Sequence, residues 1–197
     1  MATKSEVLIA LAGVDFKSLS TKELQSVYKE MLETGIHGMC FSPYLEGQGP
    51  GTIITEEQIR QRMEIIQPYT KWIRSFSCTE GNENIPRIAH AGGLKTLVGA
   101  WLGTDKRMNE KEIQNLIALA REGSVDIAAV GNEVMYRKEL SEEELLDYLY
   151  RVKHELPGIP VGYVDAYYEF AKRPRITEAC DVLLANCYPF WEGCNLE

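Results

Sequence analysis

The sequence lacks the residue groupings that metal sites and disulfide frameworks require. Its five cysteines are an odd number at scattered spacings, no Cys-x-x-Cys pair occurs, and the three histidines stand apart from one another. We therefore expect neither a zinc site nor a disulfide framework. No motif in the chain requires another cofactor, and none is expected.

Long hydrophobic runs are also missing. No stretch reaches the roughly 20 apolar residues that span a bilayer. The apolar residues 7–12 are not followed by a small-residue cleavage site, which makes them a poor signal peptide. A cytoplasmic location is the default expectation, although a secreted protein whose signal had been removed would read the same.

Positive charge is in short supply. The chain has 21 Lys and Arg against 29 Asp and Glu, so its net charge is −8. Nucleic acids and anionic membranes repel an acidic surface, and we expect neither as a partner. A neutral partner such as a sugar is not excluded. The length of 197 residues and the 45% hydrophobic content suit one globular domain with a sizeable core.

The sequence does contain a regular alternation of strand-like and helix-like segments. Seven short apolar segments are expected strands, at residues 7–13, 36–44, 72–77, 95–102, 125–130, 160–165 and 181–188. Helices are expected between them, and four of these open on the pairs Ser20/Glu23, Thr55/Gln58, Asn109/Glu112 and Ser141/Glu144. This alternation predicts parallel β-α-β units. Because the Gly-x-Gly-x-x-Gly turn of a dinucleotide-binding sheet is absent, we expect the α/β fold of a (β/α)8 TIM barrel.

The strand at 125–130 ends on Gly131-Asn132-Glu133. Parallel barrels keep their chemistry at the C-terminal ends of the strands, where a half-desolvated carboxyl could donate a proton near neutral pH. The alternative is a plain turn, with Asn132 in a left-handed conformation and Glu133 pointing into water. The tripeptide alone favours this alternative, since short motifs often match by chance.

Four motifs in order carry a resemblance to a known family. They are the segments Gly38-Met39-Cys40-Phe41, Trp72-Ile73-Arg74-Ser75-Phe76, Ala129-Val130-Gly131-Asn132-Glu133-Val134 and Leu184-Ala185-Asn186-Cys187-Tyr188-Pro189-Phe190. Over about Gly38 to Trp191 the chain resembles glycoside hydrolase family 17. Those enzymes are retaining endo-β-1,3-glucanases and related β-glucan transferases on a (β/α)8 barrel. The Gly-Asn-Glu strand, followed two strands later by Ala-Asn-x-Tyr-Pro, is a fairly specific pair.

The resemblance implies roles for individual residues and a β-glucan oligosaccharide or polysaccharide as partner. Glu133 resembles the general acid/base, and Asn132 resembles the residue that hydrogen-bonds the sugar 2-hydroxyl. The remaining candidates are Arg74, which could hold a rim carboxylate, and three aromatic residues on which sugar rings could stack, Tyr188, Phe190 and Trp191. The alternative reading of Phe190 and Trp191 is an apolar cap on the barrel rim.

The chain departs from the family at the nucleophile. The family places this Glu on the seventh barrel strand in a Glu-x-Gly-Trp-Pro-like motif, which the sequence lacks. Asp165 and Glu192 are rim carboxylates that could bind substrate or stand in for it. We expect one partial barrel domain over 1–197, with an extra strand–helix unit at 1–35 before the family-like region 36–197.

Two hypotheses follow from this departure. One is a β-1,3-glucan hydrolase that holds the acid/base but not the nucleophile, so that the chain alone is poorly active. The other is a non-catalytic glucan-binding partial barrel, which self-associates or is closed by a complementing chain.

Overall fold

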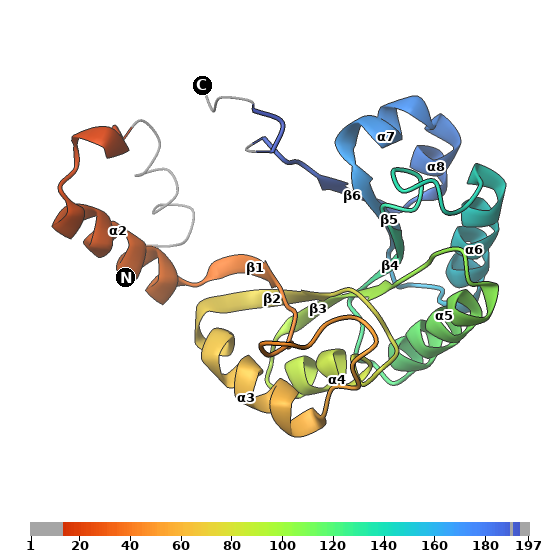
Figure 1. Ribbon diagram of the computed structural model, residues 1–197, viewed down its shortest axis with the longest axis horizontal. Coiled ribbons are helices and arrows are strands. Elements are labelled where there is room, and N and C mark those ends of the chain that lie inside the picture. Colours follow the sequence, from red (N-terminus) through yellow and green to blue (C-terminus); the bar gives the residue numbers. More distant parts are fainter. Residues whose placement is uncertain (1–13, 190, 194–197) are drawn as a thin grey trace.

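The computed structural model describes residues 14–189 and 191–193, and these contain one six-stranded parallel sheet (Figure 1). The strands follow one another in chain order across the sheet: β1 (Ile36–Cys40), β2 (Thr70–Ser75), β3 (Lys95–Ala100), β4 (Ile127–Asn132), β5 (Val161–Ala166) and β6 (Val182–Asn186). The sheet curls into an incomplete barrel, which confirms the expected fold class. The first expected strand, at residues 7–13, lies outside the described residues.

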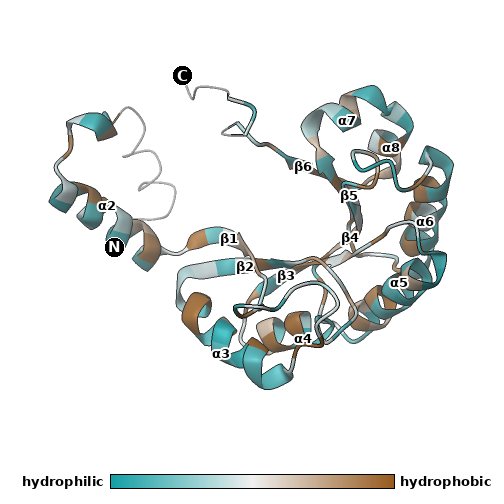
Figure 2. Cartoon of the chain, viewed as in Figure 1, coloured by the Kyte–Doolittle hydropathy of each residue, from teal (hydrophilic) through white to brown (hydrophobic). Residues whose placement is uncertain are grey.

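Helices alternate with the strands and cover the outer face of the curled sheet. In chain order the helical segments are η1 (Phe16–Ser18), α2 (Thr21–Thr34), α3 (Glu56–Ile66), η2 (Gln67–Tyr69), α4 (Asn84–Ala91), α5 (Lys106–Arg121), α6 (Glu142–Glu155), α7 (Tyr167–Lys172) and α8 (Pro174–Ala179). Figure 2 shows hydrophilic residues along the outer sides of α5 and α6. No helix in the described part of the chain is both long enough and apolar enough to cross a membrane.

The capping boxes at Ser20 and Ser141 are confirmed, because each serine and the Glu three residues later bond each other's backbone N–H. The box expected at Asn109 is wrong. Helix α5 begins one turn earlier, where Asp105 caps it by accepting from two backbone N–H groups. Asn109 and Glu112 instead lie inside the helix with buried side chains, and both hold the loops above the sheet.

The two faces of the sheet have different environments. On the outer face, Val98 and Val130 pack with α5 and α6 in the larger of two apolar clusters, and Ile73 packs with α3 and α4 in the smaller one. On the inner face, Arg74 and Leu97 alternate with these buried residues and are only partly buried. A Cβ on Gly162 would lie 2.3 Å from the β6 backbone oxygen of Val182, so only glycine allows β5 and β6 to pair this closely.

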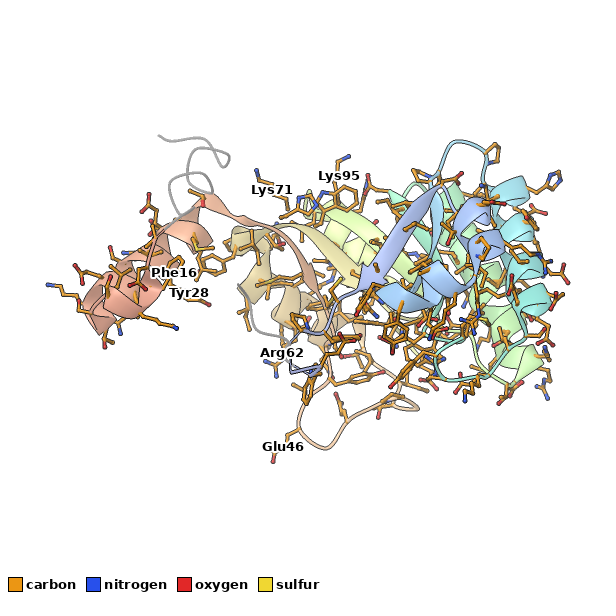
Figure 3. The ribbon with its side chains drawn as sticks, turned by 90° about the horizontal axis from the view of Figure 1, so that it is seen from above. Phe16, Tyr28, Glu46, Arg62, Lys71 and Lys95 are labelled. Carbon is orange, nitrogen blue, oxygen red and sulfur yellow. The ribbon has the colours of Figure 1, made fainter. Side chains whose placement is uncertain are left out.

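Helix α2 lies to one side of the curled sheet, apart from the helices that cover it (Figure 1). Leu24 and Tyr28 on this helix are 39% and 65% exposed, and Figure 3 shows Tyr28 and Phe16 on the part of the chain that lies apart from the sheet. None of the residues of α2 is buried. The assignment of residues 1–35 to an extra strand–helix unit remains a prediction.

Candidate functional site

The polypeptide leaves β4 through an unusual backbone conformation. Gly131 has a φ of 85°, and two residues later Glu133 has a φ of 56°. A non-glycine residue in this left-handed region costs roughly 1–3 kcal/mol and persists only where its surroundings impose it. The alternative of a plain turn placed Asn132 in the left-handed conformation. This is wrong, because Glu133 adopts that conformation instead.

The side chain of Glu133 is held at the rim of the barrel. Its Oε1 atom accepts hydrogen bonds from Asn186 Nδ2 and from the Tyr188 hydroxyl, both at 2.7 Å. Burial and the hydrogen bond to Glu133 raise the pKa of Tyr188 to about 12, so its hydroxyl remains a donor at physiological pH. The two donors come from the end of β6, two strands away in the sheet. The plain turn is also wrong in its second feature, because the carboxylate is bound rather than turned into water.

Asn132 is fixed from the opposite direction. Arg74 on β2 donates from Nη2 to Asn132 Oδ1 at 2.6 Å, and the guanidinium lies over the ring of Phe76, 4.6 Å from its centroid. The Nε–H of Arg74 is buried and has no hydrogen-bond partner among the described residues. A buried unpaired donor is costly and is expected to meet an acceptor in the working molecule. The oxygen of Asn132 is thus occupied, and its amide nitrogen is the group left to donate.

The loop after Glu133 is braced from below by β5. The hydroxyl of Tyr163 accepts from Met135 N at 3.0 Å and donates to Asp165, which also accepts from Tyr136 N at 3.3 Å. Asp165 has no exposed surface, and burial raises its pKa above the usual range. The expectation that Asp165 reaches the rim is therefore wrong in this structure, because its carboxylate is turned inward to backbone N–H groups.

Arg137 braces the same loop from the side. It donates to the backbone oxygens of Asn132 and Leu102 and pairs with Glu139. Its guanidinium lies over the ring of Trp101, 4.6 Å from the centroid. The sequence contained the residue but no motif that indicated this role.

A cavity of about 350 Å³ opens beside Glu133, and we call it the rim cavity. Three predicted residues, Tyr188, Trp191 and Glu192, line it together with Glu133. Trp191 is 81% exposed, so a broad aromatic surface faces solvent at the mouth. Phe190 lies outside the described residues. The cavity also contains residues that sequence reasoning missed, Tyr136, Ala166 and Tyr168.

The missed residues differ in how far the sequence could have indicated them. Asn186 belongs to the quoted Ala-Asn-x-Tyr motif, so its position two residues before Tyr188 was an available signal. Tyr136 lies in the loop after β4 and Tyr168 lies in the short helix α7 after β5, and no motif in the sequence indicated that either side chain reaches the cavity. Among the described residues, no group of three or more His, Cys, Asp or Glu side chains could hold a metal ion.

The fold and the rim geometry define an incomplete (β/α)8 barrel with a carboxylate and aromatic side chains at the C-terminal ends of its strands. Residues 38–197 match the BtgE/BtgC glycoside hydrolase domain. The match covers more than half of the chain, and the chain belongs to this family. This finding confirms the glycoside hydrolase resemblance that the sequence motifs indicated.

Curated relatives are fungal. The glucan 1,3-β-glucosidase BGL2 of Candida albicans is 27% identical over 148 residues, which cover 66% of this chain and 48% of the relative. The glucan 1,3-β-glucosidase of Schizosaccharomyces pombe is 27% identical over 97% of this chain and 64% of the relative. The chain therefore spans between about half and two thirds of the length of these relatives.

A solved structure supports the fold. The Rhizomucor miehei β-1,3-glucanosyltransferase, an active-site mutant in complex with laminaritriose, superposes with a TM-score of 0.69 at 24% identity. The alignment covers 82% of this chain and 60% of that chain. At this identity the likeness establishes the barrel architecture.

Proposed function

We propose that this chain carries the acid/base part of a retaining glycoside hydrolase or transferase that acts on β-1,3-glucan. The observation that carries the proposal is the placement of Glu133, whose carboxylate is held by Asn186 and Tyr188 at the mouth of an aromatic-lined cavity. The fungal relatives named above are glucan 1,3-β-glucosidases, and the family is one of glycoside hydrolases.

In this reaction Glu133 transfers one proton twice. As an acid it protonates the glycosidic oxygen while the C1–O bond breaks and a second carboxylate bonds to C1. As a base it takes a proton from water, or from a sugar hydroxyl in transfer, while that oxygen displaces the carboxylate. The hydrogen bonds from Asn186 and Tyr188 occupy one carboxylate oxygen and leave the other to exchange the proton.

The neighbours of Glu133 have supporting roles. Asn132, with its oxygen bound to Arg74, has its amide nitrogen to donate to a sugar oxygen such as the 2-hydroxyl. Tyr188 and Trp191 offer flat faces for pyranose rings, since aromatic rings pack against the apolar faces of sugars. Arg74 has a buried unpaired Nε–H, to which the second carboxylate could bind.

We infer that the second carboxylate comes from outside the described residues. Retaining hydrolysis requires the two carboxyl groups to lie about 5–5.5 Å apart. Asp165 is buried and bound to backbone N–H groups, and Glu192, which also lines the rim cavity, accepts from the Tyr167 hydroxyl and follows β6 rather than the strand on which the family carries its nucleophile. The isolated chain should therefore bind laminari-oligosaccharides but turn them over slowly or not at all.

The test is hydrolysis of laminarin by the purified chain, alone and with the C-terminal part of a fungal relative as complement. NMR of the first-formed product should show the retained β-anomer with the complement present, and Glu133→Gln should abolish it. The control is Glu64→Gln, which changes an exposed carboxylate on α3. Turnover that survives Glu133→Gln would overturn the acid/base assignment, and an absence of laminari-oligosaccharide binding would overturn the substrate.

A second candidate function is a non-catalytic glucan-binding module. The observation in its favour is that β1 and β6 each pair with only one strand among the described residues, which leaves two sheet edges open to self-association. If this function holds, sedimentation should show a dimer. The chain should also bind laminari-oligosaccharide without forming product, even with the complement present. A monomer that becomes active on complementation would exclude this function.

A further inference from the structure

A second and larger cavity lies at the same rim of the barrel, on the side of β1, β2 and β3. It measures about 670 Å³, and we call it the side groove. Aromatic residues Phe41, Tyr44, Phe76 and Trp101 line it together with the carboxylates Glu80 and Glu139. Figure 3 shows the loop that carries Glu46 extended from this end of the sheet, opposite the end that carries Lys71 and Lys95.

The floor of the side groove is organised by one buried carboxylate. Glu112 on α5 is 2% exposed and accepts four hydrogen bonds, which come from the hydroxyls of Ser77 and Thr79 and from the backbone N–H groups of Cys78 and Trp101. These donors belong to the loops after β2 and β3. A single side chain therefore fixes both loops, so the groove is largely formed before any ligand arrives.

A second device holds the wall formed by the loop after β1. Glu80 accepts from Gly51 N through its side chain at 2.9 Å and from Ile54 N through its backbone oxygen at 2.8 Å. A Cβ on Gly81 would lie 2.0 Å from the backbone oxygen of Ile54, so glycine is required for this close approach. The loop at residues 41–55 is thereby clipped to the loop after β2.

Trp101 connects the side groove to Glu133. The indole is 42% exposed, and Arg137 covers one of its faces while donating to the backbone oxygen of Asn132, next to Glu133. From the other direction, Phe76 lines the groove and carries the guanidinium of Arg74, which bonds the side chain of Asn132. The side groove and the rim cavity therefore lie on either side of Asn132.

We propose that the side groove binds further glucosyl residues of the same β-glucan chain that passes Glu133, with Trp101 as its main stacking surface. This inference rests on the proposed function and adds the direction in which the glucan extends beyond the catalytic carboxylate. A neutral glucan suits this lining, because the carboxylates Glu80 and Glu139 repel anions, and both already accept protein donors. Their remaining lone pairs suit the hydroxyl groups of a sugar.

The test measures affinity against chain length by calorimetry, with the 197-residue chain and laminari-oligosaccharides of two to six glucose units. Affinity should rise with length by about tenfold in the wild type, as expected for one added aromatic stacking contact. Trp101→Ala should remove this rise and leave the disaccharide affinity unchanged, whereas Trp101→Phe should keep most of the rise. Tyr150→Ala removes an exposed aromatic on α6, outside both cavities, and should change nothing.

The outcomes separate this inference from the proposed function. If the disaccharide binds but Trp101→Ala leaves the rise with length intact, the side groove is not a glucan site and the proposed function stands. If Trp101→Ala weakens short and long oligosaccharides equally, the side chain acts through Arg137 and the inference fails. If the wild type binds no laminari-oligosaccharide of any length, the proposed function fails first.

Discussion

The left-handed backbone at Glu133 predicts that Gly is more stable than Ala at this position, which reverses the usual order. In an ordinary helix or strand, replacing Ala by Gly costs about 0.5–1 kcal/mol, because Gly loses more backbone freedom on folding. At the φ of 56° observed for Glu133, a Cβ costs about 1–2 kcal/mol, which Gly avoids. Glu133→Gly should therefore be more stable than Glu133→Ala by roughly 1 kcal/mol.

The comparison of the two variants isolates the backbone term. Both remove the hydrogen bonds from Asn186 and Tyr188, so the loss of these bonds cancels in the difference. With a urea dependence of about 2 kcal/mol per M, the unfolding midpoint of the Gly variant should lie roughly 0.5 M higher.

Two further positions provide matched controls. Lys138 has a φ of 58° and lies outside both cavities, so the same preference for Gly should appear there. Lys111 is an exposed residue in the interior of α5, where Ala should be the more stable by about 1 kcal/mol. An Ala variant at position 133 that equals or exceeds the Gly variant, with both controls behaving as stated, would refute strain at the acid/base position.

The remaining predictions concern packing, thiol reactivity and pH. Gly162→Ala should destabilise the fold by more than about 3 kcal/mol in urea unfolding, because its Cβ would meet a β6 backbone oxygen; a smaller loss would contradict the tight pairing of β5 and β6. Burial raises the pKa of Cys180 to about 11, so at pH 8 about one thiol in a thousand is ionised, and mass spectrometry should show iodoacetamide labelling exposed Cys187 far sooner; equal rates would contradict the burial. The hydrogen bonds from Arg151 lower the pKa of Glu110 to about 2, so their stabilisation is present above pH 4.5 and lost as the pH falls toward 2. Arg151→Ala should therefore reduce the free energy of unfolding that is lost between pH 4.5 and pH 2, by less than about 1 kcal/mol because the pair is exposed. A pH profile equal to that of the wild type would show that the pair contributes nothing.

The sequence predicted the framework of the fold because local chemistry determines it. A serine and a glutamate three residues apart begin helices at Ser20 and Ser141, where an amphipathic segment follows, and buried apolar runs separated by helices can form a parallel sheet. The prediction failed at Asn109 because Asp105 is an equally good N-cap four residues earlier. Local propensity does not determine which of the two residues caps the helix. The contact of Glu112 with Ser77, 35 residues away in the sequence, favours Asp105 as the cap, because it requires Glu112 inside the helix.

The candidate site was predictable where residues lie in one motif and not where separate loops meet. The family resemblance placed Glu133 and Tyr188 at one rim, as the acid/base and a stacking surface, but it did not predict that the Tyr188 hydroxyl donates to Glu133. The inward turn of Asp165 did not follow, because it depends on the hydroxyl of Tyr163 and on backbone N–H groups from another loop. The role of Arg137 likewise depends on tertiary packing that no spacing rule encodes.

On the proposed function, we infer that the open edges of the sheet and the second carboxylate have one geometric origin. An eight-stranded barrel closes when every strand pairs with two neighbours, whereas β1 and β6 each pair with one among the described residues. Arg74 lies on β2, the neighbour of the edge strand β1, and Tyr188 lies two residues after the edge strand β6. On the proposed function, we expect a parallel segment that pairs with both edges to end its strands at the same rim, where Arg74 has a buried unpaired Nε–H and bonds Asn132 beside Glu133. Closing the sheet would then also supply the second carboxylate, so barrel completion and catalytic gain should depend on the same contact.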